Sequence, residues 1–213
     1  MATFKHISSK NADYGAAEQY LTFEHDEFTM KPTLDKNGRL VLRDDYRISS
    51  LNCGGEDFAI ACMRSNLKYG KNQKREDVKS HHYIISFDPR DAPDNGLTVD
   101  RAQQLGEQFC KEHFPGHQAL VCTHPDGHNH SGNIHVHIVI NSLRIAEVPL
   151  LPYMERPADT KEGCKHRCTD AAMEYFKAEV MEMCHRENLY QIDLLHGSKN
   201  RITEREYWAK RKG

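Results

Sequence analysis

Apolar residues recur along this chain at two spacings, one typical of strands and one typical of helices. Runs rich in β-branched and aromatic residues predict strands at residues 3–8, 81–87, 118–123 and 133–143. Helical patterning predicts helices at residues 16–25, 56–69 and 99–114, the last with Thr98 as its N-cap. The order of these elements indicates an α+β fold in which helices flank a central antiparallel β-sheet.

The pattern is more specific in two places. The helix at 56–69 is expected to carry one apolar side, formed by Phe58, Ala59, Cys62, Met63 and Leu67. The polar segment 30–46 contains the turn signal Asp35-Lys36-Asn37-Gly38, which predicts a small hairpin or flap.

The chain changes character after residue 150. Residues 150–164 are irregular and contain several prolines, whereas apolar residues at spacings of three and four predict a long helix at 169–188. We expect one domain over residues 1–150, which carries the candidate site. A helical C-terminal extension is expected over residues 151–213, and its basic end is expected to lead into a longer chain.

The composition is that of an ordinary water-soluble domain, with 38% hydrophobic and 28% charged residues. No apolar run reaches membrane-spanning length, and the N-terminus lacks the apolar stretch of a signal peptide. Seven cysteines, an odd number at irregular spacing, argue against a secreted disulfide framework. We therefore expect a cytoplasmic protein that does not contact a membrane.

The formal net charge of −2 argues against a protein that merely coats nucleic acid. Basic residues nevertheless gather in two segments, 68–79 and 199–212. In the first of them Lys71, Lys74 and Arg75 are candidates for contact with a phosphate backbone, although a solvated charged surface would have the same composition.

Histidine is the unusual residue type, because the chain contains 14 of them. His135 and His137 lie on one predicted strand, and side chains two residues apart on a strand point to the same face. Val136 and Ile138 then point to the opposite face and anchor the strand in the core. The alternative reading of this pair is two polar residues on the exposed side of an amphipathic strand.

His124 ends the preceding predicted strand, eleven residues before His135. A hairpin between the two strands brings it back beside the pair. Three imidazoles that leave open coordination positions are typical of a catalytic metal site rather than a structural one. His128 and His130, in the connecting loop, are alternatives for the third ligand.

Two nearby residues are candidates for a supporting role. Asp126 follows His124 by two residues and is expected either to orient a ligand imidazole or to cap the turn. His82 lies at the start of a neighbouring predicted strand, where it can face the side of the sheet that carries the histidines.

The pattern of a histidine pair, a third histidine eleven residues upstream and Asn141 four residues downstream resembles the HUH endonucleases. It is most similar to the relaxase/mobilisation nuclease family of conjugative plasmids and conjugative transposons. Further matches are Ser86-Phe87 before Asp88-Pro89, the helix end at 109–116, and residues 16–22. The resemblance covers roughly residues 3–143, and the remainder looks like the extension of relaxases from Gram-positive conjugative transposons.

The resemblance implies a relaxase that nicks one DNA strand at a transfer origin and rejoins it after transfer. Tyr20 falls at the family's motif position for the nucleophile, which forms a 5′-phosphotyrosine, and Tyr14 is the alternative. His124, His135 and His137 would hold one divalent cation, magnesium or manganese, with zinc or nickel as further options, and Asn141 would support the site.

The same resemblance implies the partners. They are origin-of-transfer DNA, single-stranded at the nick and next to a hairpin or duplex, a relaxosome accessory protein, and a type IV coupling protein. The protein would act in the bacterial cytoplasm and be translocated with the DNA.

Two other functions fit the same residues. One is a rolling-circle replication initiator or transposase of the same superfamily, whose tyrosine more often follows the histidine pair, as Tyr175 does here. The other is a non-catalytic DNA-binding module that contains a metal ion for structural purposes.

Overall fold

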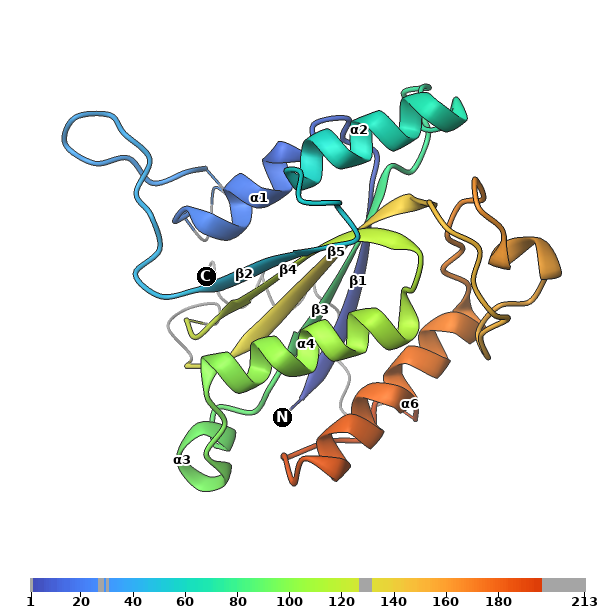
Figure 1. Cartoon of the computed structure of the whole chain (residues 1–213). Coiled ribbons are helices and arrows are strands. Elements are labelled where there is room, and N and C mark those ends of the chain that lie inside the picture. Colours follow the sequence, from blue (N-terminus) through green and yellow to red (C-terminus); the bar gives the residue numbers. More distant parts are fainter. Residues whose placement is uncertain (1, 27–28, 30, 127–131, 197–213) are drawn as a thin grey trace.

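The computed structural model describes residues 2–26, 29, 31–126 and 132–196. Its centre is a five-stranded antiparallel sheet, and the four strands predicted from the sequence are present (Figure 1). In spatial order the strands are β1 (Thr3–Ser9), β3 (Ser80–Ser86), β5 (His135–Arg144), β4 (His117–His124) and β2 (Arg47–Leu51). The fifth strand, β2, was not predicted.

Helices cover both faces of this sheet (Figure 1). One face is covered by α1 (Gly15–Thr22) and α2 (Phe58–Tyr69), and the other by α4 (Val99–His113) and α6 (Asp170–Arg186). Short turns of helix form α3 (Asp91–Asn95) and η1 (Pro157–Thr160). The α+β fold expected from the sequence is confirmed. None of the described helices has the length and apolarity needed to cross a bilayer.

The larger of two hydrophobic cores lies between the sheet and the pair α4 and α6. Alternate residues of β5, including Val136 and Ile138, point into it and meet Phe109 of α4 and Phe176 of α6. Thr98 caps α4 as expected, because its side chain accepts a hydrogen bond from the backbone nitrogen of Arg101. Because Phe176 lies in this core, α6 buries its apolar side against the same sheet that carries the histidines.

The smaller core lies under α1 and α2 and contains Leu21, Phe58 and Cys122. Here the sequence-based expectation for α2 was wrong in part, because Met63 is 47% exposed and Leu67 is 70% exposed. The helix is turned so that Ala61, Cys62 and Asn66 face the sheet instead. This rotation of the helix places the amide of Asn66 in a buried polar network. Helix propensity and apolar periodicity do not predict such a buried amide.

Strand β2 pairs with β4 from Arg47, opposite Thr123, to Leu51, opposite Ala119. It lies at the edge of the sheet and its sequence is only weakly apolar, so the patterns that mark a buried strand are absent. Its Ser49 is held by a hydrogen bond to Glu107 of α4.

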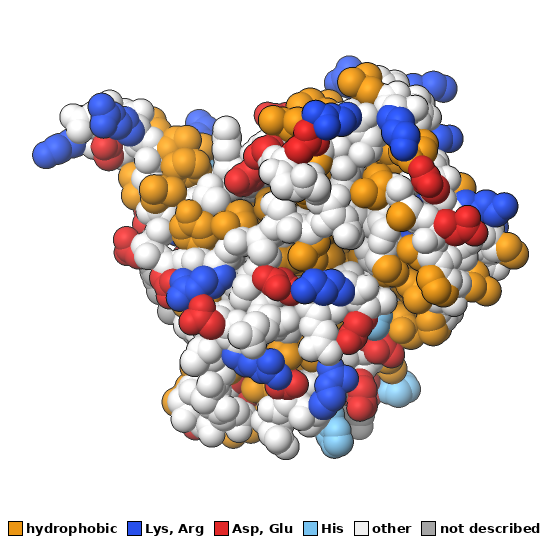
Figure 2. Space-filling view, viewed as in Figure 1, with side chains coloured by type: hydrophobic (Ala, Val, Ile, Leu, Met, Phe, Trp, Pro, Cys, Tyr) orange, Lys and Arg blue, Asp and Glu red, His pale blue; other side chains and the backbone are white. Residues whose placement is uncertain are grey.

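The predicted flap is present between α1 and β2. Isolated bridges pair Phe23 with Leu42, His25 with Pro32, and Leu34 with Leu40. Figure 2, viewed as in Figure 1, shows this segment standing out from the body of the molecule, with basic and hydrophobic side chains near its tip. Lys36 and Arg39 are exposed there, together with Leu34 and Leu40.

Candidate metal centre

The three predicted histidine ligands come together where β4 ends and β5 begins. His124 lies directly opposite His135 in the antiparallel pairing, and His137 is two residues further along β5. The ring centroids are 5.1 Å apart for His124 and His135, 5.0 Å for His124 and His137, and 4.8 Å for His135 and His137. One ligand nitrogen from each lies within 4.8 Å of the other two. All three rings lie on the face covered by α1.

Each of these imidazoles is oriented by a hydrogen bond from its other nitrogen. His124 Nε2 donates to the carbonyl oxygen of Leu21, at 2.6 Å, and His135 Nδ1 donates to that of Asn133, at 3.1 Å. A carbonyl oxygen only accepts, so these nitrogens carry the ring protons. The lone pairs are therefore on His124 Nδ1 and His135 Nε2, and these two atoms face each other at 3.3 Å.

The third ring is held by another histidine. His137 Nδ1 and His82 Nε2 are 2.8 Å apart, which leaves His137 Nε2 for a ligand. His82 is thus placed where a metal-binding imidazole ordinarily has its hydrogen-bond partner. The position expected for His82, on the site side of β3, is the one observed.

Burial favours the neutral form of His124, His137 and His82. Burial lowers the pKa of His124 to about 3, with the charges of His135 and Arg43 adding to the effect. Burial lowers the pKa of His137 well below its usual value and that of His82 to about 4. Neutral imidazoles are the form that binds metal, because only they offer a nitrogen lone pair.

The donor set fits a divalent cation. Three imidazole nitrogens lie close enough to share one ion and would leave coordination positions open, as in catalytic rather than structural sites. No other group of three potential ligands approaches this closely within the part of the chain that the structure describes. The alternatives His128 and His130 lie outside the described residues.

Tyr20 lies beside this centre. It is half-buried in α1, one residue before the carbonyl that holds His124, and its ring centroid is 6.4 Å from that of His137 at an interplanar angle of 85°. Burial raises the pKa of its phenol, Arg43 opposes that shift, and Asp126 adds to it. The site therefore brings a tyrosine hydroxyl and three imidazoles into one region.

The other two tyrosines considered as nucleophiles, Tyr14 and Tyr175, occupy different surroundings. Tyr14 is buried, and its hydroxyl donates to the carbonyl of Lys79, at 3.0 Å, and accepts from Asn66 Nδ2, at 2.7 Å. Burial raises its pKa far above the ordinary value. Tyr175 is on α6, across the sheet from the three histidines, and contacts His113 and Tyr153.

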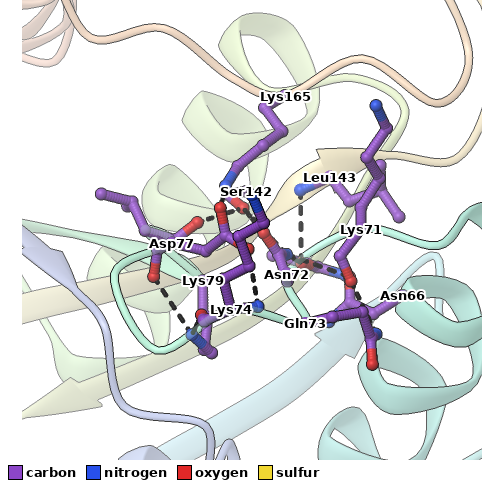
Figure 3. A network of polar contacts seen from close by, with 12 residues as sticks. Asn66, Lys71, Asn72, Gln73, Lys74, Asp77, Lys79, Ser142, Leu143 and Lys165 are labelled. Atoms are coloured by element: carbon purple, nitrogen blue, oxygen red, sulfur yellow. Dashed lines mark hydrogen bonds and ion pairs between the residues drawn. The ribbon is translucent and has the colours of Figure 1, made fainter.

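Asn141 belongs to the polar network around Tyr14 rather than to the histidine cluster. Its Oδ1 lies 3.2 Å from the Tyr14 hydroxyl, and its Nδ2 donates to Gln118, at 3.0 Å. Figure 3 shows the neighbouring part of this network, where the amide of Asn72 reaches Asn66 and Ser142. The network ties the loop after α2 to β5.

Asp126 does not hydrogen-bond to a described ligand imidazole. Its Oδ2 instead pairs with Arg43 Nη1 at 2.7 Å. The sequence carries no signal for Arg43, because nothing in a polar flap distinguishes one arginine from another. Its backbone nitrogen bonds to the carbonyl of Thr22 at 3.0 Å, which brings this end of the flap next to Tyr20.

The predicted DNA contacts Lys71, Lys74 and Arg75 are exposed but are not near the histidines. They lie in the loop before β3, and Figure 3 labels Lys71 and Lys74 there. The first residue of β3, Ser80, pairs with Asn141, whereas the last residue of β3, Ser86, pairs with His135. Six residues of strand separate these two ends, about 20 Å. Contacts from this loop would therefore reach DNA well away from the histidine cluster.

The fold and the cluster define an α+β domain with three converging histidines on its sheet. The family model described as "Relaxase: MobA/VirD2-like, nuclease domain" matches residues 36–148, which include the three histidines but not Tyr20. The chain belongs to this relaxase family and contains its nuclease domain, so the family resemblance in the sequence is confirmed.

A relative of this chain is protein Rlx of Staphylococcus aureus. It is 30% identical over 166 residues, which are 78% of this chain and 41% of the relative, so the chain spans less than half of that relative's length. A solved structure described as "Molecular Basis of Vancomycin Resistance Transfer in Staphylococcus aureus" has a TM-score of 0.50 at 13% identity. It covers 88% of this chain and 92% of its own, and it supports the fold alone.

Proposed function

We propose that this chain is the nuclease part of a DNA relaxase that nicks one strand at the transfer origin of a conjugative element. Tyr20 attacks the scissile phosphodiester, forms a 5′-phosphotyrosine and releases a 3′-hydroxyl. The covalent bond retains the energy of the broken one, so the reaction can be reversed to rejoin the strand after transfer.

One observation carries this proposal: the Tyr20 ring lies next to His137, in the same region where three imidazole lone pairs converge. A divalent cation held by His124, His135 and His137 would supply positive charge to the phosphate oxygens. The protein contributes the placement, since β4 and β5 fix the three rings and α1 fixes the phenol. Catalytic groups on regular elements hold their geometry better than groups on loops.

The proton balance closes without a further reactant. The phenol of Tyr20 loses its proton as its oxygen bonds to phosphorus, and the departing 3′-oxygen gains one. Burial raises the pKa of the phenol, which favours removal of the proton as the bond forms rather than beforehand.

The cofactor and partners follow the family. We propose magnesium or manganese as the ion, although imidazole also suits zinc and nickel. The partners proposed are origin DNA with a hairpin or duplex next to the nick, a relaxosome accessory protein and a type IV coupling protein. Lys71, Lys74 and Arg75 would contact DNA away from the nick. The protein would work in the cytoplasm and be translocated with the DNA, with residues 1–150 as the nuclease domain and 151–213 as its extension.

The test is a covalent-adduct assay. The chain is incubated with Mn²⁺ and a labelled single strand that carries the transfer origin of its own element, and the products are separated on a denaturing gel. A protein–DNA band that is present in wild type and in Tyr14→Phe, and absent in Tyr20→Phe, is expected. An adduct that persists in Tyr20→Phe and disappears in Tyr14→Phe would assign the chemistry to Tyr14.

The same assay separates the other candidates. A replication initiator or transposase that used Tyr175 would lose its adduct in Tyr175→Phe, but that residue lies across the sheet from the histidines. A non-catalytic module would form no adduct with any tyrosine, while metal removal would still lower its melting temperature.

A further inference from the structure

Arg43 is the basic residue that the flap brings to the metal centre. Its backbone nitrogen hydrogen-bonds to Thr22, two residues after Tyr20, and the adjacent Leu42 pairs with Phe23. Its side chain is only 15% exposed. The guanidinium therefore lies at the junction of α1, the flap and the end of β4, which is also where the phenol and the imidazoles lie.

The influence of Arg43 on its neighbours confirms that position. After burial and His135, Arg43 is the next cause that lowers the pKa of His124, and it also contributes to the lowered pKa of His137. It is the neighbour that opposes the effect of burial on Tyr20. One cation thus acts on two metal-ligand candidates and on the proposed nucleophile.

The hydrogen bonds of Arg43 are incomplete. Nη1 pairs with Asp126, whereas Nε is fully buried and has no acceptor among the described residues. Buried donors without partners are rare in native proteins and destabilise the fold. The pair with Asp126 offsets little of that, because the carboxylate is 44% exposed and such pairs contribute little to stability. Folding alone does not account for an arginine held in this way.

We propose that Arg43 binds a non-bridging oxygen of the scissile phosphate and stabilises the charge that develops there when Tyr20 attacks. Nε is buried and Nη1 is paired with Asp126, which leaves Nη2 as the nitrogen that can donate a charge-assisted hydrogen bond to a phosphate oxygen. Arg43 is in this sense a catalytic residue, and Asp126 is a positioning residue that acts through it. The inference rests on the proposed nicking function.

The pairing with Asp126 also explains how two positive groups can share one site. A bare guanidinium near three imidazoles would disfavour a divalent cation among them. The carboxylate of Asp126 balances that charge from the Nη1 side and leaves Nη2 for the substrate. Phosphate oxygens that enter between the metal site and Arg43 would then meet positive charge on both sides.

The first experiment measures single-turnover cleavage at saturating origin oligonucleotide with Mn²⁺. Arg43→Ala is expected to slow cleavage about 100-fold, as removal of one oxyanion donor does in other enzymes. Affinity for the uncleaved strand should remain as in wild type, because Arg43 acts on the transition state. Mn²⁺ binding without DNA should be no weaker than in wild type, because the variant removes a positive charge from the site. Arg43→Lys should recover part of the rate, since it keeps the charge but not the planar guanidinium.

Arg47→Ala is the matched control. Arg47 is four residues further along, pairs with Asp45 and Asp100 at 2.6 Å, and lies outside the site, so its loss should leave the cleavage rate unchanged. A rate in Arg43→Ala equal to that of Arg47→Ala would overturn the inference. Absence of cleavage in wild type would instead reject the proposed function, so the two failures are distinguishable.

A charge swap separates catalysis from folding. The double variant Arg43→Asp/Asp126→Arg keeps an ion pair between the flap and the segment after β4 but moves the cation to the other side of the pair. It should melt close to wild type, as a thermal scan would show, and cleave no faster than Arg43→Ala. Recovery of wild-type cleavage in the swapped protein would make the pair merely structural.

Coupling tests the role of Asp126. Asp126→Ala alone should slow cleavage less than Arg43→Ala. The double variant Arg43→Ala/Asp126→Ala should be no slower than Arg43→Ala, because Asp126 acts only through Arg43. If the rate reductions of the two single variants multiplied in the double variant, Asp126 would act independently of Arg43.

Discussion

The sheet carries histidines on both of its faces, and the two groups differ in where their ring nitrogens point. On the face under α1, which we call the site face, one ring nitrogen from each of His124, His135 and His137 converges on a common point. Their other nitrogens are each held from outside the cluster, by Leu21, Asn133 and His82. Each ring therefore has one nitrogen engaged in the fold and one directed at a common point.

The opposite face, which packs against α4 and α6 and which we call the core face, has the reverse arrangement. His166 Nε2 bonds to the hydroxyl of Tyr83 at 2.7 Å, and His117 Nδ1 donates to the carbonyl of Asn141 at 2.8 Å. His6 and His81 bond to each other at 2.9 Å. His6 stacks on Tyr83 and His166 meets Phe114 edge-on, and among the described residues no three nitrogens of these rings converge.

The comparison shows that histidine density does not by itself make a metal site. His124 on the site face and His117 on the core face are both buried, and burial lowers the pKa of both, so the two faces share these properties. What differs is orientation, which depends on hydrogen bonds to the nitrogen that does not face the ion. The experiments below test that distinction, from the largest expected effect to the smallest.

The largest effect should come from removing one ligand on the site face. In His137→Ala, Mn²⁺ binding measured by calorimetry should be lost. Cleavage should fall about a thousandfold, the equivalent of the several kcal/mol of charge stabilisation that a bound cation supplies. His166→Gln, on the core face, is the control and should bind Mn²⁺ as wild type does. Equal loss of binding in both variants would contradict the assignment of the two faces.

A smaller effect is expected from the residue that orients a ligand. His82→Gln removes the partner of His137 Nδ1 and should weaken Mn²⁺ binding by about 10- to 100-fold. Its neighbour on the strand, His81, points to the core face, so His81→Gln should leave Mn²⁺ affinity unchanged. If calorimetry gave the same affinity for His82→Gln as for wild type, the hydrogen bond to His137 would have no role in binding.

The site face could be predicted from sequence because two local rules describe it. The period of two along β5 places His135 and His137 together, and a hairpin places His124 opposite the pair. The strands of the sheet interior were found for the same reason, since their apolar residues follow that period. The short polar edge strand β2 has no such pattern and was missed.

What the sequence could not supply depends on contacts between distant segments. The carbonyl of Leu21 that holds His124 is 103 residues away in the chain, and Arg43 is 83 residues from Asp126. Neither pairing follows from a local spacing, because both require knowledge of where α1 and the flap meet the end of β4. The turn of α2 that exposes Leu67 and buries Asn66 is another such case.

On the core face, the loss of a hydrogen bond should affect stability rather than metal binding. Tyr83→Phe removes the hydroxyl that bonds to His166, whose Nδ1 already lacks a partner among the described residues. The free energy of unfolding should fall by about 1–3 kcal/mol, the cost of an unsatisfied buried polar group. Urea denaturation measures this change, and Mn²⁺ affinity serves as the control that should not move. A weakened Mn²⁺ site would show that the two faces are coupled through the sheet.

The smallest effect concerns the pH dependence of stability. Burial lowers the pKa of His117 to about 3, with Arg144 adding to the effect, and the carbonyls of Asn141 and Leu143 opposing it. In the unfolded chain the same ring has a pKa of about 6.5. Below that value the unfolded state binds a proton that the folded state does not, so the stability falls as the pH drops from about 6.5 toward 3.

At pH 5.5, His117 should have lowered the free energy of unfolding by about 1 kcal/mol relative to neutral pH. The reason is that stability changes by at most about 1.4 kcal/mol per pH unit for each proton. Urea denaturation with EDTA at several pH values measures the slope for wild type and for His117→Gln. Other buried histidines keep part of the slope in the variant, so the expected result is a shallower dependence rather than a flat one. An identical slope for wild type and His117→Gln would mean that His117 accepts a proton in the folded protein as it does in the unfolded chain. The neutral form assigned to this ring would then be wrong.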